Sequence, residues 1–180
     1  MIEVNITDLA TPALQKAIRR FSNHRPTLMA IGEIVLEFTK ERFDVSTDPY
    51  GVPWLPNKAS TLENYLAQRT SGRHRTQKGA LTAKAQRMLV AKKPLIGVSR
   101  SLSKQFHYRV LVDSVEVRSS MKYAAMQQFG GNKTKFPHLW GNIPPRPFFP
   151  NGLRGMPPRL EKRIFDVLRE AFLPQNEQSG

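Results

Sequence analysis

Apolar side chains recur along residues 27–43 at the spacing of one face of an α-helix. The earlier stretch 11–23 has the same spacing and begins with Thr11-Pro12, a pair that caps and starts a helix. The stripes are formed by Leu28, Ile31, Val35 and Phe38 in the later stretch and by Leu14, Ile18 and Phe21 in the earlier one. We therefore predict a helical hairpin whose two apolar stripes face a core.

Two shorter helices are predicted on either side of a basic loop. Ser60-Thr61-Leu62-Glu63 is a capping box, which predicts a helix over 61–69. A second helical pattern covers about 80–92 and ends before Pro94. The intervening residues 70–79 are polar and basic, so we expect an exposed, mobile loop. Residues 70–93 together are predicted to form a basic, exposed insertion.

Residues 105–112 alternate well, with Phe106, Tyr108, Val110 and Val112 on one face and His107, Arg109 and Leu111 on the other, which predicts a β-strand. Asp113-Ser114 is a candidate two-residue turn, and the apolar positions resume at Val115 and Val117. We predict a β-hairpin over about 105–119.

The C-terminal part contains two more helical patterns. Residues 122–129 predict a short helix that ends at Gly130 in the left-handed conformation. Residues 159–173 predict an amphipathic helix that packs on the sheet or on a neighbouring subunit, and residues 174–180 a frayed tail. The whole pattern predicts an α+β fold in a single domain, 1–180, with N-terminal helices, a small antiparallel sheet and a C-terminal amphipathic helix.

Two proline-containing segments interrupt these elements. In residues 48–56 the Asp48-Pro49 and Gly51 turn signals predict a structural turn from which Tyr50 and Trp54 fold back onto the core. Residues 143–149 read as a stiff extended arm that places Phe148 and Phe149 against a core or a partner subunit. The same segment also fits a polyproline-II ligand for an aromatic groove.

The formal net charge of +14 is concentrated in the middle of the chain. Residues 49–112 contain 12 basic side chains and a single acidic one, Glu63. Such asymmetry indicates either contact with a polyanion (nucleic acid, an acidic protein face or anionic lipid) or a solvated surface that aids solubility.

The residues that could carry chemistry are few. The sequence has no cysteine, so it offers no disulfide or thiolate metal site, which fits a reducing compartment. Its 4 histidines have neither one another nor a carboxylate at metal-ligand spacing. No nucleophile motif or phosphate loop is present, so we expect neither an enzyme nor a cofactor. We also expect no signal peptide and no membrane-spanning segment.

The basic stretch is the best candidate for contact with nucleic acid. It contains no aromatic residue between Tyr65 and Phe106, so base stacking is not expected and any contact would be with phosphates, independent of sequence. A non-specific nucleic-acid-binding protein is therefore the alternative function. The candidate contacts are Arg69, Arg73, Arg75, Lys78, Lys84, Arg87, Lys92 and Lys93.

Three separated segments, Asp48–Trp54, Tyr123–Gly131 and Ile143–Phe149, resemble the phage virion morphogenesis family, which includes tail completion proteins of Mu-like contractile-tailed phages. The resemblance spans roughly residues 27–172. The chain has Gln127 where the family commonly has histidine and Pro145 where it commonly has alanine.

The resemblance implies a structural virion protein that completes the tail or joins tail to head as a homo-oligomer, such as a ring at the neck or tail end. The implied partners are copies of itself and other phage tail and head–neck proteins, with no membrane. From the basic stretch we also expect a non-specific contact with phage DNA. The implied location is the virion, and the host cytoplasm during assembly. The candidate interface residues are Tyr123, Phe129, Arg146, Phe148 and Phe149.

Overall fold

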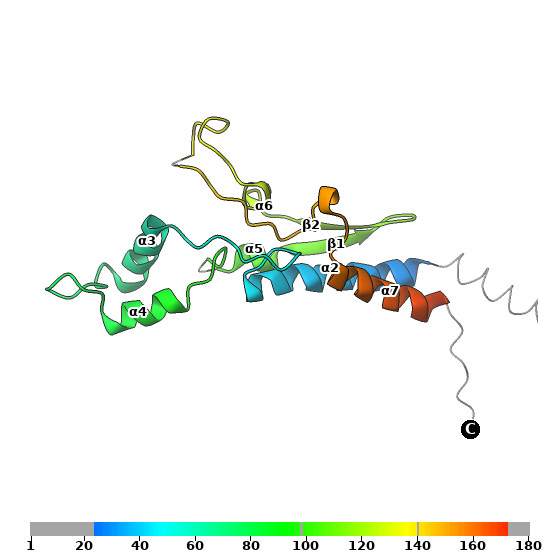
Figure 1. Cartoon of the computed structure of the whole chain (residues 1–180), viewed down its shortest axis with the longest axis horizontal. Coiled ribbons are helices and arrows are strands. Elements are labelled where there is room, and N and C mark those ends of the chain that lie inside the picture. The colour runs from blue at the N-terminus through cyan, green and yellow to red at the C-terminus, as the bar shows by residue number, and fades with distance from the viewer. Residues whose placement is uncertain (1–23, 98, 140, 173–180) are drawn as a thin grey trace, which may run out of the picture. The chain divides into compact units, whose positions relative to one another are not determined.

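The computed structural model describes residues 24–97, 99–139 and 141–172. They contain helices α2 to α7, a 3₁₀ turn η1 and two strands, which confirms the predicted α+β class (Figure 1). The helix expected over 11–23 and the tail 174–180 lie outside these residues. The elements are α2 (Arg25–Val45), α3 (Ala59–Thr70), α4 (Ala83–Val90), α5 (Ser101–Lys104), β1 (Phe106–Val110), β2 (Val115–Ser119), α6 (Ala124–Phe129), η1 (Gly152–Arg154) and α7 (Pro158–Phe172).

The helices predicted within the described residues are present, but the starts of those expected over 61–69 and 80–92 were wrong. Ser60 is not a cap, because α3 begins at Ala59 with Lys58 as N-cap and no side-chain cap. Glu63 does not fold back to the helix start and instead binds residues 74 and 75. Helix α4 begins at Ala83, because Ala80 and Leu81 pair with the loop before them and Thr82 accepts the capping hydrogen bond from Ala85 N.

The predicted hairpin is confirmed, with its turn one residue earlier. Leu111 N donates to Ser114 O over 2.8 Å, so Val112 and Asp113 occupy the turn in place of Asp113 and Ser114. The strands pair in one antiparallel, two-stranded sheet. Because Val112 is at the tip it is 83% exposed, and it does not continue the apolar face formed by Phe106, Tyr108 and Val110.

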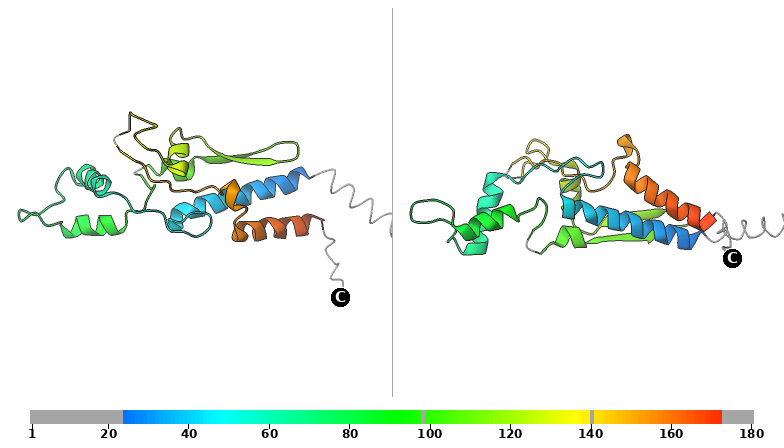
Figure 2. Two further views of the ribbon diagram at one scale, coloured as in Figure 1. Left: turned by 45° about the horizontal axis from the view of Figure 1, so that its top comes forward. Right: turned by 60° about the horizontal axis from the view of Figure 1, so that its bottom comes forward.

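The described chain divides into two compact units. The first comprises 24–38, 107–118 and 156–172. In this unit the N-terminal part of α2 lies between the hairpin and α7 (Figure 2). The Tyr108 hydroxyl donates to Glu33 over 2.9 Å, and its ring covers Gly32, where a Cβ would lie 2.5 Å from a ring carbon. Arg163 of α7 pairs with Glu37.

The second unit comprises 39–106 and 119–155 and is built around a cluster of aromatic rings. The Phe43 ring lies 5.3 Å from Trp54 and 5.5 Å from Phe148, and the Phe106 ring lies 5.4 Å from Phe148. Phe149 joins at 5.0 Å from Phe148. Trp54 therefore folds onto the core as predicted, and Phe148 lies inside its own unit.

Candidate functional site

The three segments that carried the family resemblance meet in the second unit. In the first of them, Asp48 accepts hydrogen bonds from the backbone N–H groups of Tyr50 and Val52, both over 2.8 Å, which fixes the turn. Trp54 Nε1 donates to the carbonyl oxygen of Pro147 over 2.8 Å. The turn therefore holds the proline-rich arm 143–149 from one side.

Tyr50 binds the chain that follows the arm. Its hydroxyl lies 2.9 Å from the carbonyl oxygen of Asn151 and 2.8 Å from that of Gly155. The guanidinium of Arg154 lies over its ring at 3.8 Å from the ring centre, a cation–π contact. Tyr50 thus fixes the turn 151–155 to the turn at Asp48.

Helix α6 holds the arm from the other side. The buried Gln128 accepts hydrogen bonds from Phe148 N over 2.9 Å and Phe149 N over 3.0 Å, and it donates to Phe149 O over 3.0 Å. Arg146 N donates to Gln127 O over 2.8 Å. Because these bonds satisfy backbone groups beside the aromatic core, they set which side chains of the arm point inward.

Gly130 and Gly131 turn the chain from α6 toward the arm. Gly131 pairs with Ile143 through two hydrogen bonds of 3.0 and 2.7 Å. The positive φ of Gly130 (76°) was predicted, but its ψ of 173° is extended, so the left-handed helical conformation was wrong. This region of backbone space is essentially restricted to glycine. A Cβ here would also lie 2.9 Å from Ile143 O.

The five predicted interface residues fall into two groups. Phe148 and Arg146 lie inside the unit, 0% and 6% exposed. Arg146 donates to the carbonyl oxygens of Leu55 (2.8 Å) and Pro56 (2.9 Å), so it holds the segment after Trp54 in place. Phe149 is half-buried, whereas Tyr123 is 44% and Phe129 78% exposed. The structure therefore presents Tyr123 and Phe129, at the two ends of α6, to the surface.

Phe129 borders two apolar hollows. One has a volume of about 880 Å³ and lies toward the extended segment at Leu55 and the arm. The other, of about 500 Å³, lies toward Phe149 and the segment before α6. The apolar residues that line them include Leu55, Phe136, Ile143, Pro144 and Pro145 in the first and Met121, Ala125, Pro147, Phe149 and Pro150 in the second.

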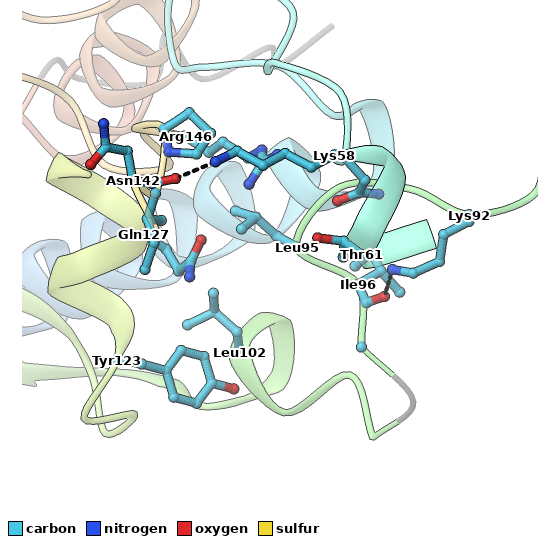
Figure 3. A pocket seen from close by; sticks show the side chains of 14 residues that line it. Lys58, Thr61, Lys92, Leu95, Ile96, Leu102, Tyr123, Gln127, Asn142 and Arg146 are labelled. Carbon is cyan, nitrogen blue, oxygen red and sulfur yellow. Dashed lines mark hydrogen bonds between the residues drawn. The ribbon is translucent and has the colours of Figure 1, made fainter. Parts of the chain in front are cut away.

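A third hollow, of about 360 Å³, is basic (Figure 3). We call it the basic pocket; it is lined by residues that include Lys58, Lys92, Leu95, Ile96, Leu102, Tyr123, Gln127, Asn142, Ile143 and Arg146. Burial, and then the charge of Arg146, hold the pKa of Lys92 below its usual range. Burial likewise lowers the pKa of Arg146. The pocket thus brings two of the partly desolvated cations of this unit into one place.

The eight predicted nucleic-acid contacts are also divided. Four have contacts within the unit: Arg75 with Glu63, Lys93 with the carbonyl oxygen of Asp44, and Arg69 and Lys92 over the ring of Tyr65. The other four, Arg73, Lys78, Lys84 and Arg87, are exposed and have no side-chain hydrogen bond or ion pair with any residue that the structure describes.

Sequence reasoning missed the cluster around Glu63. Its carboxylate lies 2.7 Å from His74 Nε2 and 3.1 Å from Arg75 Nη2, and these hydrogen bonds hold the pKa of Glu63 below its usual range. His74 is buried, with 8% exposure. The signal in the sequence was that Glu63 is the only acid among 12 basic residues.

Residues 24–97, 99–139 and 141–172 contain no group of three or more His, Cys, Asp or Glu side chains placed to hold a metal ion. The same residues also contain no helix with the length and apolar character needed to span a bilayer.

Comparison with known proteins gives one match. A family model described as the phage virion morphogenesis family matches residues 5–172. No curated protein and no solved structure matches the chain.

Proposed function

Because this chain belongs to the phage virion morphogenesis family, we propose that it is a structural subunit which assembles with copies of itself. The family supports a role in phage morphogenesis and is a structural one. We further propose that the protein completes the tail or joins tail to head, as a ring at the neck or tail end. Its partners are then further copies and other tail or head–neck proteins. It enters the virion from the host cytoplasm during assembly.

The exposed ring of Phe129 is the observation that supports self-assembly. A phenylalanine that is 78% exposed leaves apolar surface in water, and burying such a side chain contributes about 1.5–3 kcal/mol. Its surroundings are already shaped to receive a partner, because Phe129 stands between two apolar hollows. An aromatic anchor beside preformed pockets is typical of the residues that dominate binding at interfaces.

The proposal predicts that Phe129→Ala weakens self-association. Light scattering coupled to size exclusion over a dilution series should show dissociation of the variant at a concentration about tenfold or more above that of the wild type. Phe165→Ala is the matched control, because Phe165 is 58% exposed on α7 in the other unit. Equal association of wild type and Phe129→Ala, or a monomeric wild type at every concentration, would contradict the proposal.

A second role, non-specific contact with phage DNA, has its own support. Arg73, Lys78, Lys84 and Arg87 are exposed cations of the basic stretch that have no side-chain hydrogen bond or ion pair with any described residue. Exposed lysine and arginine bind phosphates and release counterions without reading bases. We propose that these four side chains face phage DNA when the subunit is assembled.

A further inference from the structure

The basic pocket has an unusual combination of charge and shape. It is a hollow of about 360 Å³, enough for one or two side chains, and its lining includes Lys58, Lys92 and Arg146. No Asp or Glu is among its lining residues. The pocket is therefore positive, with no carboxylate of its own to balance that charge.

Backbone carbonyl groups hold the three cations in place without neutralising them. Lys58 Nζ donates to Asn142 O over 2.7 Å, and Lys92 Nζ donates to the carbonyl oxygens of Lys93 (3.1 Å) and Ile96. The guanidinium of Arg146 donates hydrogen bonds to the carbonyl oxygens of Leu55 and Pro56. A bound anion would enter the positive field of these side chains. Burial, and then the charge of Arg146, lower the pKa of Lys92, and an anion beside it would oppose both effects by favouring the charged amine.

The rest of the lining favours a carboxylate on a peptide over the phosphates of DNA. Leu95, Ile96 and Leu102 form apolar walls together with Ile143, Pro144 and the ring of Tyr123. A duplex presents its phosphates on a convex, hydrated surface that would not enter a hollow of this size. An acidic side chain with aliphatic neighbours would place its charge on the lysines and its apolar neighbours on these walls.

The chain contains a segment of this chemistry. Residues 2–8, which precede the described part of the chain, read Ile-Glu-Val-Asn-Ile-Thr-Asp. They carry two acids and no base, and aliphatic side chains alternate with the polar ones. Charge complementarity across an interface gives specificity and register.

We propose that the basic pocket binds the acidic segment 2–8 of a neighbouring copy, with Glu3 or Asp8 placed between Lys58 and Lys92. The proposal rests on the self-assembly proposed above and assigns it a second contact. Assembly would then use both the apolar surface at Phe129 and an ionic contact at this pocket.

The first test uses a fluorescent synthetic peptide of residues 1–10, titrated with the full-length protein and followed by anisotropy. We expect binding that weakens about tenfold or more when Lys58 and Lys92 are both changed to Gln, or when the peptide carries Glu3→Gln and Asp8→Asn. Equal binding of the neutral peptide, or unchanged binding by the Lys58→Gln/Lys92→Gln protein, overturns the proposal. Displacement of the peptide by random duplex DNA but not by unlabelled peptide assigns the pocket to nucleic acid and also overturns it.

The second test asks whether the segment comes from another copy. Glu3→Gln/Asp8→Asn and Lys58→Gln/Lys92→Gln proteins should each self-associate less than the wild type. Mixing them should partly restore association, because each supplies the half that the other lacks. Absence of restoration means that the segment binds its own chain, which overturns the proposal. The Phe129→Ala protein separates the two proposals, since it should bind the peptide as the wild type does whatever its own state of association.

Discussion

Gln128 lies near the end of α6 and Gly130 directly follows the helix, and both fix the proline-rich arm. The Gln128 amide makes three hydrogen bonds with the backbone of Phe148 and Phe149, which a leucine of similar size could not replace. Gly130 adopts φ 76° and ψ 173°, where a side chain would be strained. Together they fix the arm against the helix.

At this scale we predict that Gly130→Ala destabilises the protein by about 1–3 kcal/mol, because alanine is strained at this φ and its Cβ would meet Ile143 O. Urea unfolding measures the loss. Gly152→Ala is the matched control, since no atom lies within 4 Å of its added Cβ and its φ is not positive. Equal stability of the two variants would show that a side chain at position 130 causes no strain.

At the scale of elements, one carboxylate organises the connection between α3 and α4. Leu66 and Ala85 bury the apolar faces of these helices, 1% and 0% exposed. Glu63 of α3 then binds His74 and Arg75 in the loop between them. The loop also pairs with itself, since Thr76 N donates to Ala80 O over 2.8 Å and Thr82 N donates to His74 O over 3.0 Å.

We predict that Glu63→Ala loosens this loop at neutral pH. Hydrogen exchange at the amides of Thr76 and Thr82 should quicken a few-fold, because exposed ionic contacts are weak. Asn64→Ala, at the next position on α3, is the control and should leave these amides unchanged. The role of Glu63 would be contradicted if exchange at these amides quickened in the control, or if it stayed at the wild-type rate in Glu63→Ala.

The same contact gives a pH dependence with a defined sign. The folded-state pKa of Glu63 is lowered from its ordinary value of 4.5, so the folded state favours the ionised carboxylate. The stability that Glu63 contributes to the folded state is therefore present above pH 4.5, and it is lost as the pH falls through the lower folded-state pKa. In the wild type, the protection of the Thr76 and Thr82 amides from hydrogen exchange should decrease over that acidic range. In Glu63→Ala it should already be reduced at neutral pH.

At the scale of the whole molecule, charge and apolar surface are the two features that bear on partners. The net charge of +14 is large for 180 residues, and 12 of the 28 basic side chains fall between 49 and 112. A field of this kind attracts polyanions and depends on salt. Whether the field acts on DNA depends on where the charges lie and not on the total alone.

We predict that Arg73→Glu, Lys84→Glu and Arg87→Glu in one protein weaken binding to random duplex DNA and flatten its salt dependence. Each reversal changes the charge by −2, which takes +14 to +8. The control reverses Lys104, Lys162 and Arg169, which gives the same net charge at other places. Gel shifts over a range of salt should show that the first protein binds random duplex DNA about tenfold or more weakly than the control does. Equal loss would mean that only total charge matters.

Local sequence determined the elements of this protein. The apolar period over 27–43, the alternation over 105–112 and the amphipathic pattern over 159–173 correspond to α2, β1 and α7. These patterns depend on neighbours a few positions apart, so they are visible without the fold. The boundary at Ser60 was wrong because Glu63 binds His74 in the loop after its helix. The hairpin turn was one residue off because Leu111 N pairs with Ser114 O.

Only the tertiary structure decided what the site residues do. From the sequence, the motif 143–149 could place Phe148 and Phe149 against either a core or a partner subunit. Its roles followed from contacts across about 90 positions, Arg146 with Leu55 and Trp54 with Pro147. Those contacts bury Arg146 and Phe148 and leave Phe129 exposed. The basic pocket likewise combines residues from distant segments. Burial depends on which distant segments meet in space, and no local pattern of apolar and polar residues encodes that.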